Sequence, residues 1–295
     1  MGNLKRDLMI ILKGGMIGVA NIIPGVSGGT IAVVLGIYEK LIESISNFLT
    51  NKEKRSEYIA FLAKIAIGAL IIIFISAKLM KFLLENYNIF TNLAFVGLIA
   101  GSIPSIYKSN DDMKINAASV VTFIVGAAII LIFELAFPQM EKKEGVHVAF
   151  TLTTDSALML AIAGFFSGGS MIVPGISGSF IMLLLGQYYI VTSCVADREI
   201  APLLVVAVGI VLGIIVFAKL INYFLKHYSK ETFYFILGLV IASLFSIYPG
   251  LPDSLNGTII AILITVFFFV ISYIIGERSN SNKKKSKDRG VAQPG

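Results

Sequence analysis

The chain has few of the residues that build disulfides, metal sites and water-soluble surfaces. Its 295 residues include one cysteine, Cys194, so no disulfide framework forms within a monomer. Its two histidines, His147 and His227, are far apart, and the absence of a histidine and cysteine cluster argues against a structural zinc site, so no metal or cofactor is predicted. Charged residues make up 14% of the chain, against 56% apolar residues. A soluble domain could not keep so much apolar surface out of water, and the composition predicts an integral membrane protein.

Long apolar stretches predict an all-α polytopic membrane protein. A helix needs roughly 17 to 25 apolar residues to cross a bilayer, and most of the stretches reach that length. The single stretches cover residues 59–77, 93–107, 115–137, 203–218, 233–248 and 257–276. Two further tracts, 8–48 and 157–192, are each close to twice a single span. Each of these two is either a re-entrant hairpin or a pair of tight spans.

The two long tracts carry the same motif near their middle. The first has Pro24-Gly25-Val26-Ser27-Gly28-Gly29-Thr30, and the second has Pro174-Gly175-Ile176-Ser177-Gly178-Ser179-Phe180. Proline ends a helix because it lacks an N–H and clashes with the preceding turn, and glycine lets backbone approach closely. The helices are therefore expected to break at Pro24, Gly25, Pro174 and Gly175, and to begin again at or just after Ser27 and Ser177. Matched breaks at membrane depth are typical of a transporter's substrate site.

The residues after each break predict an anion site. The start of a helix has unpaired N–H groups and the positive end of the helix dipole, and hydroxyl groups add donors. The predicted ligands of a phosphate or carboxylate are Ser27, Gly28, Gly29, Thr30, Ser177, Gly178 and Ser179, with Lys13 adding positive charge. Two alternatives stay open: the motifs only kink helices for close packing, and Lys13 only extends to the membrane interface.

Two carboxylates lie within or beside the apolar tracts. Ionisable groups at membrane depth are costly and often functional, so Glu39 and Glu134 are candidates to carry protons. Either carboxylate could instead lie at a membrane interface.

The chain consists of two similar halves, residues 1–140 and 150–278. A shift of 150 residues, followed by one of 141 after a shorter loop, superposes identical residues. The first shift aligns Gly14 with Gly164, Gly18 with Gly168, Pro24 with Pro174 and Tyr38 with Tyr188, and the second aligns Gly68 with Gly209 and Gly97 with Gly238. Each half is predicted to contain a re-entrant or broken segment plus three transmembrane helices.

Loop charges predict the orientation. If each motif segment enters and leaves on one side, each half crosses three times and the second half is an inverted repeat. The basic loops then share one face with both termini, which is cytoplasmic by the positive-inside rule. If each motif segment crosses once, the termini are still cytoplasmic but the loop at 52–55 moves outside. The basic tail, 279–295, is predicted to be disordered near anionic headgroups and not a nucleic-acid-binding arm.

The motifs and their surroundings resemble the bacterial polyprenyl-phosphate transporter family. The resemblance covers nearly the whole chain up to about residue 276, and its most specific parts are the stretches 20–30, 36–39, 174–179 and 186–188. Asn21 stands where the family has aspartate or asparagine, so no acidic role is assigned there. The resemblance implies an undecaprenyl-phosphate translocase of the cytoplasmic membrane, which returns this lipid carrier from the outer to the inner leaflet for synthesis of peptidoglycan and other envelope polymers.

Membrane potential adds a requirement to such a function. Moving one negative charge toward a negative interior costs about 2.3 kcal/mol per 100 mV. Inward transport of a phosphate is thus expected to be coupled to H⁺ or Na⁺. The sequence leaves open which ion is used, and whether the chain acts as a monomer or a homodimer.

Two other functions fit parts of the pattern. A membrane polyprenyl-diphosphate phosphatase has a similar motif, but with an arginine after the serine, where this chain has Gly28 and Gly178. Phosphoanhydride cleavage needs strong charge stabilisation, so the missing arginine argues against an enzyme. A transporter of a small soluble anion could use the same helix starts.

Overall fold

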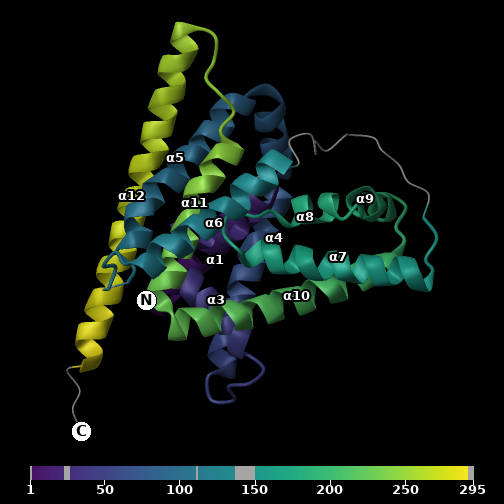
Figure 1. Cartoon of the computed structure of the whole chain (residues 1–295), viewed down its shortest axis with the longest axis horizontal. Coiled ribbons are helices and arrows are strands. Elements are labelled where there is room, and N and C mark those ends of the chain that lie inside the picture. Colours follow the sequence, from purple (N-terminus) through teal and green to yellow (C-terminus); the bar gives the residue numbers. More distant parts are fainter. Residues whose placement is uncertain (1, 23–26, 111, 137–149, 292–295) are drawn as a thin grey trace.

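The computed structural model is a bundle of α-helices, and its described residues are 2–22, 27–110, 112–136 and 150–291, which contain no strand (Figure 1). The first six helices are α1 (Gly2–Ile22), α2 (Gly28–Val34), α3 (Tyr38–Asn47), α4 (Arg55–Asn86), α5 (Asn88–Tyr107) and α6 (Ala117–Ala136). The second six are α7 (Thr154–Ile172), α8 (Gly178–Leu184), α9 (Tyr188–Ala196), α10 (Ile200–His227), α11 (Ser229–Ile247) and α12 (Leu255–Val291). The second set repeats the order of the first, including the seven-residue helices α2 and α8.

Within the described residues, seven helices are long and apolar enough to cross a membrane, which confirms the predicted multi-pass helical protein. Three belong to the first set (α4, α5 and α6) and four to the second (α7, α10, α11 and α12). The sequence predicted three transmembrane helices in each half. The one further candidate span among the described residues is α7, the first arm of the second motif segment. After Ile172 the chain turns back, since α8 packs along α7, and it then bends by 109° into α9. Figure 1 shows this hairpin extending to one side of the bundle.

Glycines set the closest helix contacts, and they pair helices that run in the same direction. Gly14 of α1 faces Ile65 of α4, and one turn later Gly18 faces Ala69. Because residue numbers increase in the same direction along both helices, α1 and α4 are parallel. The same pattern pairs α7 with α10, through Gly164 at Val206 and Gly168 at Ile210. The chain between two parallel helices must return to the end where the first began, and α2–α3 and α8–α9 make that return.

The remaining long helices pair across the two halves. The helix α5 packs along α12, with Gly97 facing Thr265 and Gly101 facing Phe269, while α6 packs along α11, with Gly126 facing Phe235. Each half thus places two helices against the other half, and neither half could bury these faces alone. Small residues allow the close backbone approach that stabilises such pairs in a membrane.

Replacement of Gly68 by leucine is expected to lower the stability of the protein. A Cβ atom at Gly68 would lie 1.9 Å from the carbonyl oxygen of Ile11, so α1 and α4 would have to separate. Overpacking of this kind costs about 1 to 3 kcal/mol or more. Thermal unfolding of purified Gly68→Leu in detergent would show a lower Tm, whereas Ala66→Leu, on the exposed side of α4, would not. Equal melting of the two variants would contradict the assigned α1–α4 packing.

Both ends of the described chain lie at one end of the bundle, here named the basal end. At this end Lys64 binds Asp7 near the start of α1, with 2.6 Å between Nζ and Oδ1, and Lys108 binds Glu277 of α12 at the same distance. The predicted disorder of the tail is not found up to Val291, because α12 continues as a helix to that residue. The tail has no proline before Pro294 and is rich in lysine, a good helix former, so it can extend the preceding helix.

Candidate functional site

The two motifs meet in the middle of the protein. Ser27 Oγ donates a hydrogen bond to the Val173 carbonyl oxygen at 3.0 Å, and Thr30 Oγ1 accepts one from the Gly175 amide at 2.8 Å. Ser27 and Thr30 are buried. We name this contact, of residues 27–30 with residues 172–175, the motif junction. It brings together segments that lie about 145 residues apart in the sequence.

Two further residues close the motif junction. A Cβ atom at Gly29 would lie 2.7 Å from the carbonyl oxygen of Ile172, so only glycine allows this approach. Tyr38, which is buried, donates its hydroxyl to the same carbonyl oxygen at 3.1 Å. In the sequence Tyr38 is recognised only as part of the repeat with Tyr188, because its contact with α7 depends on tertiary packing.

Both short helices begin where the motif predicts. Ser27 and Ser177 have extended backbone, with φ −96° and −89°, and precede helices that begin at Gly28 and Gly178. α7 ends at Ile172, and Gly175, with φ +85°, turns the chain in a left-handed conformation that glycine allows. In the second motif, residues 173–177 separate the end of α7 from the start of α8. Pro24 and Gly25, the predicted break in the first motif, lie outside the described residues.

The serines of the second motif are more accessible than those of the first. Ser177 and Ser179 are half-buried, and their hydroxyl oxygens lie 2.9 Å apart at the start of α8. Gly178 is held through its carbonyl oxygen, which accepts a hydrogen bond from Ser167 at 2.9 Å. The cause of the difference is packing: α2 and α3 pack against α5, α7 and α10, whereas α8 and α9 pack mainly on α7 and α10 of their own half.

Two predicted residues lie away from the motif junction. Lys13 Nζ donates to the carbonyl oxygen of Leu35 at 2.8 Å, so its charge lies at the C-terminal end of α2 and not beside Ser27. A cation is favourable there because the last carbonyl groups of a helix carry partial negative charge. Glu134 is exposed in the last turn of α6. The sequence placed Lys13 beside the first motif because α1 and α2 follow each other in the chain. In the structure α2 runs back along α1, so Lys13 lies beside the end of α2 and not its start.

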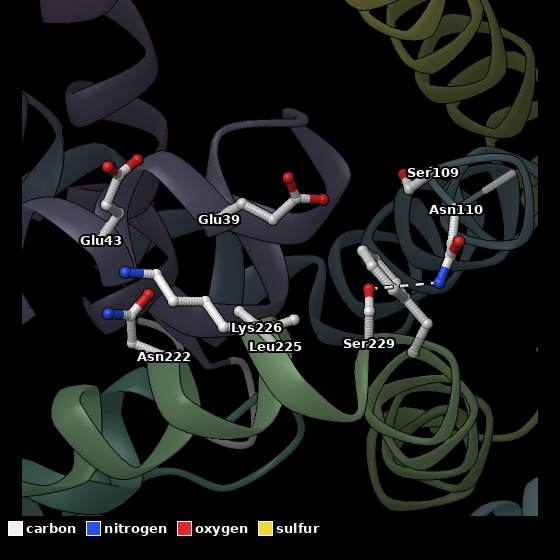
Figure 2. Close-up of a pocket in the computed structure, with 9 residues that line it drawn as sticks. Glu39, Glu43, Ser109, Asn110, Asn222, Leu225, Lys226 and Ser229 are labelled. Atoms are coloured by element: carbon white, nitrogen blue, oxygen red, sulfur yellow. Dashed lines mark hydrogen bonds between the residues drawn. The ribbon is translucent and has the colours of Figure 1, made fainter.

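A polar pocket of about 330 Å³ opens at the basal end, and we name it the vestibule. Both halves line it, and Figure 2 shows its polar groups converging from several elements. These are Glu39 and Glu43 of α3, Ser109 and Asn110 after α5, and Asn222 and Lys226 of α10. Ser229 of α11 accepts a hydrogen bond from Asn110 at 3.1 Å across the vestibule wall.

The vestibule leads toward the motif junction. A smaller cavity of about 20 Å³ shares Glu39, Ser109 and Phe233 with it and reaches Gly36 and Tyr38. Tyr38 in turn contacts Ile172 at the junction. The structure therefore brings Glu39 into the same region as the motifs. The lysine and asparagines of the vestibule were missed in the sequence because no motif marks them and they come from distant segments.

Comparison with known proteins finds relatives that match most of this chain. A family described as undecaprenyl phosphate translocase-like matches residues 17–269. A protein of Staphylococcus aureus named polyprenyl-phosphate transporter is 34% identical over 282 residues, which cover 92% of this chain and 97% of that protein. A protein of the same name from Vibrio cholerae is 31% identical over 259 residues, which cover 84% of this chain and 80% of that protein. No solved structure gives a significant match. The chain therefore belongs to the undecaprenyl phosphate translocase-like family.

Proposed function

We propose that this protein transports polyprenyl phosphate across the cytoplasmic membrane, moving undecaprenyl phosphate from the outer to the inner leaflet for reuse in cell-envelope synthesis. The observation that carries the proposal is the motif junction, where the hydroxyl-bearing start of α2 contacts residues 172–175, the segment of the other half that leads into the start of α8. The names of the two similar transporters support the substrate class.

The phosphate headgroup would bind at the residues predicted from the motifs. Ser177 and Ser179 offer half-buried hydroxyls, and Ser27 and Thr30 lie on the other side of the junction. A charge-assisted hydrogen bond to phosphate is stronger than one between neutral groups, so the hydroxyls would exchange their present partners for the headgroup. The polyprenyl tail would stay in the lipid beside the bundle.

The two halves would act as inverted repeats with both termini in the cytoplasm. The parallel pairs α1–α4 and α7–α10 support a motif segment that enters and leaves on one side in each half. Cations gather at the basal end, which supports its cytoplasmic placement. They include Lys5, Arg6, Lys52, Lys54, Arg55, Lys108, Lys114, Lys226 and Lys230. Alternating access would then be a rocking of one half against the other about the motif junction.

Coupling to protons is proposed to run through Glu39. This carboxylate is half-buried between the vestibule and the cavity beside Tyr38. It could carry a proton with each phosphate and so offset the cost of about 2.3 kcal/mol per charge per 100 mV. In proteoliposomes with an imposed pH gradient, Glu39→Gln is expected to lose gradient-driven uptake while exchange without a gradient persists. Uptake by the original protein that ignores both pH gradient and potential would refute the coupling.

A leaflet-resolved assay tests the function itself. Undecaprenyl phosphate labelled in one leaflet of a proteoliposome is expected to move only when the protein is present, and polyprenol without phosphate is not. Release of inorganic phosphate from labelled polyprenyl diphosphate would instead identify an enzyme. Equal inhibition by free phosphate and by phosphorylated lipid, with no effect of the tail, would favour a transporter of small anions.

A further inference from the structure

The vestibule combines groups that attract phosphate with groups that repel it. Lys226 enters it from the last turns of α10, and Asn110, Asn222 and Ser229 supply neutral polar groups. Glu39 and Glu43 enter from α3. In Figure 2 the Lys226 amine extends toward the side of Glu43 and Asn222, while Glu39 points toward Ser109 and Asn110. Of the described residues that line this pocket, one cation and two carboxylates would face an anion.

The carboxylates are held in position by the fold. Tyr58 of α4 donates its hydroxyl to Glu43 Oε1 at 2.8 Å, and Asn222 Nδ2 donates to Ser46 Oγ at 3.1 Å, which ties α3 to α10. Tyr38, next to Glu39, is tied to Ile172. The two acidic groups are thus part of the vestibule wall, and an entering anion would not simply displace them.

The second half lacks these charges. The repeat that aligns Tyr38 with Tyr188 aligns Glu39 with Tyr189 and Glu43 with Ser193. The helix α9 therefore carries neutral residues where α3 carries two carboxylates. If the halves exchange roles during transport, the two faces of the protein differ in how strongly they repel a phosphate.

We propose that the vestibule is a low-affinity exit site for a phosphate monoester headgroup, in which Lys226 draws the phosphate from the motif junction and Glu39 and Glu43 prevent it from staying. A transport site must bind well enough to admit its ligand and weakly enough to release it. The neutral counterpart on α9 makes release easier at the basal face than at the opposite face. The inference rests on the proposed function and adds a release step to it.

Equilibrium binding of polyprenyl phosphate to the full-length protein in nanodiscs tests the exit site. Glu39→Gln and Glu43→Gln are each expected to tighten binding by about 3- to 10-fold, the factor for one like charge removed from a half-exposed site. Lys226→Gln is expected to weaken it by a similar factor, and Lys226→Arg to keep it. The matched controls Glu53→Gln and Lys52→Gln make the same charge changes on exposed residues of the basal end and are expected to have no effect.

The pattern of opposite signs separates an electrostatic role from a structural one. Loss of packing would weaken binding in every variant, and in Glu43→Gln the new amide oxygen could still accept the hydrogen bond of Tyr58. The exit site would be overturned if Glu39→Gln and Glu43→Gln bound polyprenyl phosphate no more tightly than the original protein does. So would a Lys226→Gln variant that binds normally.

The ligands distinguish this failure from failure of the proposed function. Polyprenol is expected not to bind, and inorganic phosphate is expected to follow the same order of variants with lower affinity. The same order for inorganic phosphate, without binding or transport of polyprenyl phosphate, would retain the site and overturn the lipid substrate. Transport of polyprenyl phosphate with no response of binding to the three vestibule charges would overturn the exit site alone.

Discussion

Ser177→Ala is expected to lower uptake of polyprenyl phosphate by about 10- to 100-fold. The Ser177 hydroxyl lies at the start of α8, half-buried and 2.9 Å from that of Ser179, so both can turn toward one phosphate. A hydrogen bond to a charged group contributes about 1.5 to 3 kcal/mol, which corresponds to that factor. Ser27→Ala is expected to act similarly, because it also removes the bond to Val173.

A matched serine serves as the control. Ser243 is buried in α11 and donates to the Val240 carbonyl oxygen within its own helix, so Ser243→Ala makes the same change away from the junction. All three variants should accumulate in the membrane. Uptake is measured in proteoliposomes with polyprenyl phosphate in one leaflet. Unchanged uptake in both Ser27→Ala and Ser177→Ala would remove the motif serines from the mechanism.

Gly29→Val is expected to abolish transport, the largest effect of any single substitution considered. Its Cβ would lie 2.7 Å from the Ile172 oxygen and 3.2 Å from the Val173 carbonyl carbon, and backbone cannot move aside as a flexible side chain can. The start of α2 would separate from residues 172–175, and the bonds of Ser27 and Thr30 would break with it.

Graded substitutions make this prediction sharper. Gly29→Ala adds the Cβ alone and should retain part of the uptake, whereas Gly29→Val adds two more methyl groups and should retain none. Val33→Ile, on the half-buried side of the same helix, is expected to stay near the original rate. Membrane accumulation and a monodisperse elution profile are measured for each variant. Normal uptake by Gly29→Val would show that the motif junction is not part of the transport path.

Local patterns predicted the parts of the site that depend on neighbouring residues. The helix starts at Gly28 and Gly178 followed from the residue types of the motif, because helix breaking by proline and glycine is decided within one or two turns. The position of Lys13 did not follow, since it depends on the direction in which α2 runs back along α1. The extension of α12 to Val291 did not follow from the sequence either, because a helix can continue from a stable segment into residues that would not start one.

The sequence alone determined that this is a multi-pass helical membrane protein with two matching motifs in two similar halves. Composition, span length and repetition need no knowledge of distant contacts. Only the tertiary structure decided that the motifs touch, that α5 and α6 pair with α12 and α11, and that Glu39, Glu43 and Lys226 share one pocket. The physical reason is that these contacts join segments more than a hundred residues apart, whose approach is set by glycine-lined helix packing and not by local preference.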